Sequence, residues 1–136
     1  MNKCKLKALG LVALTAVIVG CSSATAEKER QLELVASNRA GLLSAELPLE
    51  AGPLSIMRAN SKGSTIEIMM VYNDDARGAK PTAVMLRQSI NTYCTTPDTK
   101  NNLEMGLSYR IKIRNSRGQL MADEYITHDR CVNTSQ

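Results

Sequence analysis

Few side chains in this chain of 136 residues are of a type and spacing that could carry chemistry. The single histidine, His128, stands beside Asp129 and five positions after Asp123, so an acidic partner could orient it as a general base. No serine or cysteine stands in a nucleophile motif, and the phosphate-loop, H-E-x-x-H and dinucleotide patterns are missing. The sequence therefore predicts no catalytic residue, no metal site and no cofactor, and we interpret His128 as an exposed residue at a strand end.

Cys21 carries the strongest chemical signal. Residues 1–20 begin with three lysines and continue in an apolar stretch, from about position 9 to 19, that is typical of a secretory signal and too short to span a bilayer. A buried helix is the alternative for this stretch. Ile18-Val19-Gly20-Cys21 resembles a bacterial lipobox, whose cysteine thiol takes a diacylglycerol, and two or three acyl chains hold a protein on a membrane. We expect lipid attachment at Cys21, and Ser22 in place of aspartate indicates the outer membrane.

The remaining cysteines have a simple assignment. Cys4 leaves with the signal and Cys21 is lipidated, so Cys94 and Cys131 remain, 37 positions apart. Two cysteines in an oxidising compartment most simply pair with each other, and closing this loop would stabilise the fold by about 4 kcal/mol. Free thiols or a metal site are the alternatives. We predict a Cys94–Cys131 disulfide.

The net charge gives little reason to expect nucleic acid as a partner. The whole chain has a net charge of +4, but three of its 17 basic residues lie in the signal. Without residues 1–20, 14 basic residues stand against 13 acidic ones, a net charge of +1. The apparent basicity is mostly a targeting feature.

Hydrophobic periodicity divides the mature chain into a tether and one domain. Residues 21–28 are small and polar and are predicted to be a lipidated tether, and 29–136 to be a single α+β domain. Within the domain the patterns predict a helix over 29–47, followed by a hairpin of 54–60 with 64–72. A second helix is predicted over 82–94, followed by a loop over 95–104 with at most one helical turn. The last predicted element is a hairpin of 107–114 with 120–127. This αββαββ order predicts an antiparallel sheet of four or five strands with the helices on one side, closed by one disulfide.

Similar turns connect both predicted hairpins. The tetrapeptides NSKG (60–63) and NSRG (115–118) each join two strands that follow a helix. They indicate either a weak internal duplication or convergence on good turn residues.

One face of the predicted sheet is basic. Alternation in the strand at 107–114 places Arg110, Lys112 and Arg114 together, opposite an apolar face. Such a row is typical of a solvated face, and contact with a phosphate or lipid headgroup is the alternative. The row has no interleaved aromatic residues on which bases could stack.

Methionines are the other notable group. Six of the seven methionines follow the signal, and core packing explains most of them. A groove between the second helix and the sheet, accepting an apolar helix, would use the rest. The residues we expect in that groove are Met69, Met85, Leu86 and Ile90.

The order of these parts resembles the type II secretion pilotins of the AspS or GspS-beta type over nearly the whole mature chain. The resemblance depends on these parts in chain order: lipobox Cys21, a first helix ending before Leu47-Pro48, a hairpin around a glycine turn, a helix closing at Cys94, the Pro97-Asp98 step, the strand GLSYRIKI, and Asp129-Arg130-Cys131.

The resemblance implies a non-enzymatic lipoprotein, anchored in the inner leaflet of a Gram-negative outer membrane with its domain in the periplasm. Its partners would be the C-terminal segment of secretin subunits, which such pilotins bind to promote targeting and assembly, and the lipoprotein sorting machinery. No nucleic-acid partner is implied.

Two other hypotheses remain open from the sequence. A periplasm-facing lipoprotein could inhibit an envelope or host hydrolase by inserting a loop into its active site, and the loop over 95–104, held by the disulfide, would be that loop. An envelope enzyme could use His128 with an acidic partner.

Overall fold

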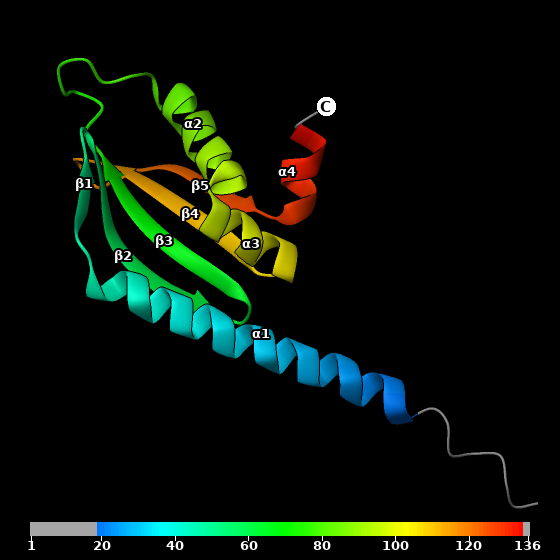
Figure 1. Cartoon of the computed structure of the whole chain (residues 1–136). Helices are drawn as coiled ribbons and strands as arrows, with labels where there is room; N and C mark the ends of the chain where they lie inside the picture. The colour runs from blue at the N-terminus through cyan, green and yellow to red at the C-terminus, as the bar shows by residue number, and fades with distance from the viewer. Residues whose placement is uncertain (1–18, 135–136) are drawn as a thin grey trace, which may run out of the picture.

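The computed structural model describes residues 19–134, which form an α+β fold with five strands in one sheet (Figure 1). The elements in chain order are α1 (Val19–Ala45), β1 (Leu49–Ala51), β2 (Leu54–Lys62), β3 (Thr65–Tyr72), α2 (Thr82–Thr95), α3 (Pro97–Met105), β4 (Ser108–Asn115), β5 (Leu120–Ile126) and α4 (His128–Thr134). The predicted α+β class and the upper strand count are confirmed. The expected signal segment lies outside the described residues, apart from its last two, which belong to α1.

The sheet is mixed, with strand order β1-β2-β3-β4-β5. Its pairs are antiparallel, as expected, except for β3 and β4, which run parallel with Thr65 opposite Ser108 and Tyr72 opposite Asn115. The prediction of an antiparallel sheet is corrected at this one pair. The chain between β3 and β4 carries α2 and α3 back over the sheet, so β4 starts at the same end as β3, as parallel pairing requires.

Alternation along the two central strands separates a buried face from an open one. The buried side chains come from every second position, as the sequence predicts, and the polar ones between them face away. The buried set is Ile66, Ile68, Met70 and Tyr72 on β3 and Tyr109, Ile111 and Ile113 on β4. Leu107, just before β4, and Ile126, the last residue of β5, complete this core.

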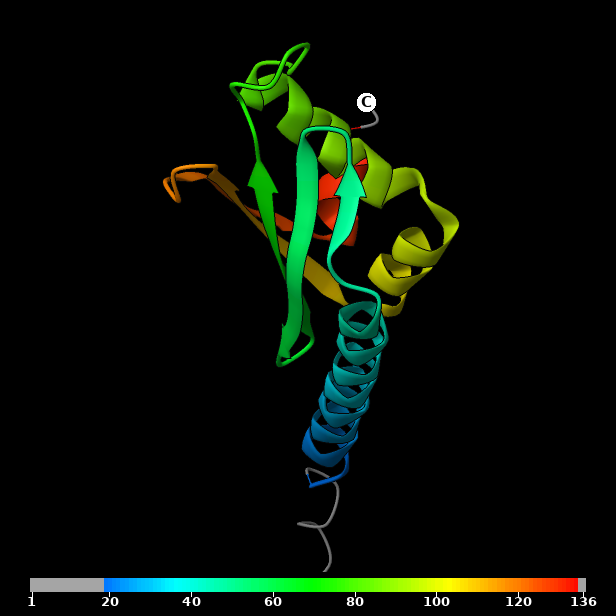
Figure 2. The ribbon, with the colours of Figure 1, turned by 90° about the vertical axis from the view of Figure 1, so that its left-hand side faces the viewer.

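Small residues bring α1 close to the sheet. Ala36 and Ala40 are 0% and 3% exposed, so the helix backbone approaches the strands without an intervening side chain. The Ser44 hydroxyl donates to the Ala59 carbonyl of β2 and fixes the end of the helix there. The helix starts earlier than predicted: the described part of the expected tether is helical, and residues 23–31 are exposed and project beyond the sheet (Figure 2). Among the described residues, no helix has the length and apolar character needed to span a membrane.

The segment 95–104 is helical except at Thr96, which corrects the predicted loop. Pro97 takes the first position of α3, where its missing N–H has no partner to lose, and Asp98 lies in the first turn, at the positive end of the helix dipole. Gly106 ends the helix at φ +115°, a conformation that favours glycine. The inhibitor hypothesis depended on an exposed loop here, and the structure removes that loop.

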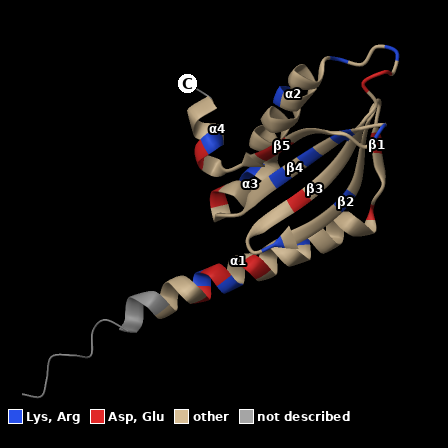
Figure 3. Ribbon diagram, turned by 180° about the vertical axis from the view of Figure 1, so that it is seen from behind, with Lys and Arg blue, Asp and Glu red and all other residues tan. Residues whose placement is uncertain are grey.

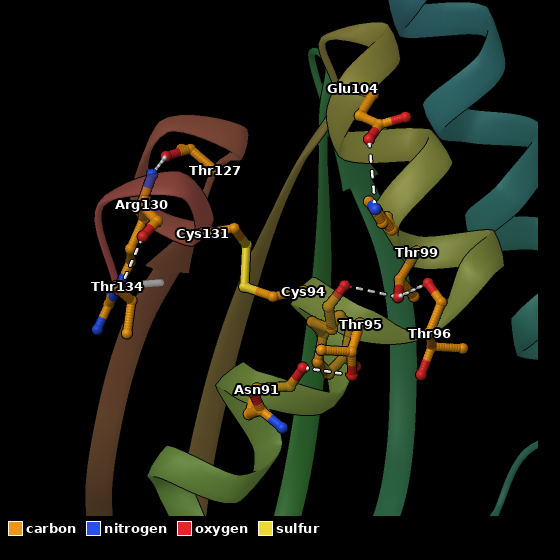
Figure 4. Close-up of a disulfide and its surroundings, with 12 residues drawn as sticks. Asn91, Cys94, Thr95, Thr96, Thr99, Glu104, Thr127, Arg130, Cys131 and Thr134 are labelled. Carbon is orange, nitrogen blue, oxygen red and sulfur yellow. Dashed lines mark hydrogen bonds and ion pairs between the residues drawn. A yellow bond between two sulfur atoms is a disulfide. The ribbon is translucent and has the colours of Figure 1, made fainter. Parts of the chain in front are cut away.

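A short helix, α4, follows β5 where the sequence indicated no element. The Thr127 hydroxyl accepts a hydrogen bond from the Arg130 N–H and caps its first turn. None of its described residues is buried, so packing alone holds it weakly. The Cys94–Cys131 disulfide joins it to the end of α2, which confirms the predicted pairing (Figure 4).

Candidate functional site

A groove of about 790 Å³ lies between α1 and the α2–α3 pair, over the helix-covered face of the sheet. Its floor comes from β2 and β3, one wall from α1 and the β1–β2 hairpin, and the other wall from α2 and α3. The apolar lining is Leu42, Leu43, Leu54, Ile56, Ile66, Ile68, Met70, Tyr72 and Met85. An apolar groove with a polar edge is the form of site that accepts an amphipathic helix.

The α1 wall exposes apolar surface in the groove. Leu42 is 58% exposed, and Leu43 beside it is half-buried against the core. Leu54 and Ile56 on β2 are also only partly buried. Leaving such side chains in water forfeits burial free energy that a partner could recover, about 25 cal/mol for each Å² covered.

The opposite wall carries a row of hydroxyls from α2 and α3. It consists of Ser89, Thr92, Thr96 and Thr99. The Thr92 hydroxyl donates to the Gln88 carbonyl, and the Thr99 hydroxyl donates to the Tyr93 carbonyl at 2.7 Å. Because these two protons are used within the chain, each of the two hydroxyl oxygens can only accept a further hydrogen bond, and each threonine also has a methyl group. The wall therefore suits the polar flank of a helix.

Two tyrosines line the groove, Tyr109 buried and Tyr93 partly buried. The rings of Tyr93 and Tyr109 lie 4.9 Å apart between centroids, and the Asn102 side-chain amide donates to the Tyr109 hydroxyl at 2.7 Å. Burial raises the pKa of Tyr93, and Tyr109 adds to this; burial also raises the pKa of Tyr109. Both phenols therefore stay neutral near pH 7. They contribute apolar ring surface and hydrogen bonds and do not act as bases.

The structure brings only one of the four predicted groove residues into the groove. Met85 lines it, buried at 7% exposure. Met69 lies on the open face of the sheet, paired with Arg58 and Lys112, so its assignment is corrected. Leu86 packs against the core, and Ile90 faces a second hollow between α2, α3 and α4. The prediction missed the contribution of α1 and β2.

His128 makes no ion pair with an acidic side chain among residues 19–134. It is exposed at the first position of α4, and the carboxylate of Asp123 is engaged by Arg110. Among the described residues, no group of three or more histidine, cysteine or acidic side chains could hold a metal ion.

On the open face, Arg110 forms the centre of a small charge network. Figure 3 shows basic positions on β4 and an acidic position on the neighbouring β3. Its guanidinium contacts the Asp123 carboxylate through two nitrogens at 2.8 Å each and the Glu67 carboxylate at 3.2 Å, and lies 5.2 Å from the centre of the Tyr125 ring. The hydrogen bonds from Arg110 lower the pKa of Asp123, and the positive charges of Arg110 and Lys112 lower it further. The basic row predicted from the sequence is thus partly neutralised at its first member.

We expect Arg110→Gln to bring the pKa of Asp123 back toward its ordinary value of about 3.9, because the variant removes the charged donor. Carbon-13 titration of the carboxyl group measures this directly. Since the folded pKa is lowered, the pair stabilises the fold above that ordinary value, and its contribution is lost as the pH falls through the folded pKa.

The control for this titration is Arg114→Gln. The Arg114 guanidinium donates to the Gly118 carbonyl, so its removal should leave the Asp123 titration unchanged. An equal pKa of Asp123 in the wild type and in Arg110→Gln would contradict the assignment.

Cys21 lies near the start of α1, which leads from the predicted anchor to the groove wall. Residues 23–31 are exposed, and Leu32 is the first described side chain of α1 that packs against the core. The arrangement joins a candidate attachment point to a groove through one helix.

Comparison with known proteins gives consistent matches. A family model described as Type II secretion system (T2SS) pilotin, S protein, matches residues 28–131. The structure of the type II secretion system pilotin AspS from Vibrio cholerae is 58% identical in sequence, with a TM-score of 0.74 over 78% of this chain and 97% of that one.

Two further proteins are similar to this chain. The type 2 secretion pilotin EpsS of Vibrio vulnificus is 60% identical, with a TM-score of 0.74 over 78% of this chain and 96% of that one. Lipoprotein YghG of Escherichia coli K12 is 22% identical over 107 residues, 79% of each chain. The family model's match, residues 28–131, includes the groove and the disulfide.

Proposed function

Because this chain belongs to the family of type II secretion system pilotins, we propose that it binds the C-terminal segment of secretin subunits and promotes their targeting to, and assembly in, the outer membrane. In this role the protein is a non-enzymatic assembly factor. The groove between α1 and the α2–α3 pair is the observation that carries the proposal.

The groove has the length of a short helix. Its floor on β3 runs from Ile66 to Tyr72, seven residues whose ends lie about 20 Å apart at the rise of a strand. A helix covers that distance in about 13 residues. A flexible tail of this length can order as it binds, since burial of its apolar face against Leu42, Leu54 and Ile56 offsets the loss of conformational entropy.

Cys21 supplies the anchor in this proposal, after removal of residues 1–20. The relative named Lipoprotein YghG supports a lipidated form. The helix rises about 17 Å between Cys21 and Leu32, so the segment 21–28 acts as a helical spacer that holds the groove away from the bilayer. Lipoprotein sorting would then carry the bound secretin subunit with the anchor.

We expect Cys21→Ala to leave most of the secretin outside the outer membrane, because without acyl chains the protein has no hold on that membrane. The measurement is the distribution of secretin multimers between separated inner and outer membranes. Mass spectrometry of the N-terminal peptide of the wild type checks the modification itself.

Cys4→Ala is the matched control, since it makes the same change within the segment that the proposal removes. It should leave secretin location unchanged. Normal amounts of multimers in the outer membrane of the Cys21→Ala strain would contradict the proposal.

A further inference from the structure

The charged side chains that line the groove stand at its two ends. At the end marked by Tyr72, Lys80 lines the groove, and its carbonyl accepts a hydrogen bond from the Tyr72 hydroxyl at 2.6 Å. At the other end, Arg39 of α1 and Asp98 of α3 line the groove beside Tyr109. Tyr109 pairs with Ile66, the opposite end of the same floor strand.

Of the described residues that line the groove, Lys80 is the charged one at the Tyr72 end. The Lys80 ammonium donates to the Gln88 side-chain oxygen at 3.3 Å, which places it along α2, and it makes no ion pair among residues 19–134. Asp74, Asp75 and Arg77 lie in the same loop but do not line the groove. Two of the three ammonium protons remain available to a bound anion.

The Tyr109 end is electrically mixed. Burial is the largest effect on the pKa of Tyr109 and raises it, while Arg39 lowers this pKa and Asp98 raises it further. Neither side chain makes an ion pair within the part of the chain that the structure describes. This end therefore offers both signs of charge, whereas the Tyr72 end offers only a positive one.

A helix at the C-terminal end of a polypeptide has a charge distribution that matches the two ends of the groove. Its C-terminus carries the negative end of the helix dipole and a free carboxylate, and its N-terminus carries the positive end. We propose that the groove binds its partner in one direction, with the terminal carboxylate beside Lys80 and the first helical turn between Arg39 and Asp98. This inference rests on the proposed function, since it requires a segment with a free C-terminus.

The test uses two synthetic peptides with the sequence of the C-terminal segment, about 20 residues, of the secretin from the same organism. One peptide ends in a free carboxylate and the other in an amide. Both are titrated calorimetrically against the full-length protein in detergent. The free acid should bind the wild type about fivefold more tightly than the amide, a ratio typical of one charge at a helix end. Lys80→Gln should abolish this ratio by weakening only the free acid.

Arg77→Gln is the matched control: it removes an exposed cation from the same loop, outside the groove, and should keep the fivefold ratio. A photo-reactive group on the peptide N-terminus should cross-link to α1 or α3 near Arg39 and Asp98. Cross-links to the loop at 78–80, or equal binding of acid and amide to the wild type, would overturn the orientation and leave the proposed function standing. Failure of both peptides to bind would overturn the proposed function as well.

Discussion

Replacing both half-cystines, with Cys94→Ala and Cys131→Ala together, is expected to lower the free energy of unfolding by about 4 kcal/mol, because the bond closes a loop with a sequence separation of 37. The effect is large for a domain whose total stability is about 5–15 kcal/mol. Urea denaturation of the purified protein, followed by circular dichroism, measures it. Hydrogen exchange should also accelerate in α4, since none of that helix's described residues is buried.

Truncation of two side chains adds its own cost, so the wild type treated with reductant is the control. Reduction keeps both side chains and removes only the bond, and it should reproduce most of the loss. The double variant should not respond to reductant. A double variant within 1 kcal/mol of the oxidised wild type would show that α4 is held by other contacts, such as the bonds from Arg130 to Glu124 and to the Tyr125 carbonyl.

Local patterns in the sequence predict most of the regular elements. The alternation at 65–72 and 107–114 identifies both central strands and their buried faces, and the apolar stripe at 29–47 identifies the long helix. Periodicity reports which side of an element is apolar, but not which strand lies beside it. The parallel pairing of β3 and β4 depends on the route of the chain through α2 and α3, so it could not be predicted from either strand.

Some of the missed features did have signals. Pro97, Asp98 and Gly106 bracket α3 with the residues that typically begin and end a helix, but the polar sequence between them reads as a loop. Met69 is two positions from Glu67 on the same strand, so both side chains lie on the open face of the sheet. Only the residue type of Met69 favoured its assignment to the groove. The groove itself arises from the distance between α1 and α2 over the sheet, a tertiary quantity that no local pattern encodes.

Thr92→Trp is expected to reduce binding of the secretin peptide by at least about 100-fold. Thr92 is exposed and lines the groove from α2, so the new side chain enters space that the partner needs. An aromatic side chain of this size presents about 150–250 Å² of surface, enough to cover much of the apolar floor in place of the peptide. The measurement is calorimetric titration of the free-acid peptide, with thermal unfolding to show that the fold is retained.

Asn91→Trp makes the same substitution one position earlier on α2, where the residue is exposed and faces the second hollow instead of the groove. Because the two variants add the same surface to the same helix, any general effect of an exposed indole should appear in both. Peptide affinity should stay within about twofold of the wild type in Asn91→Trp and fall only in Thr92→Trp. If Asn91→Trp alone lost affinity, the partner would occupy the hollow between α2, α3 and α4, and the groove over β3 would not be the binding site.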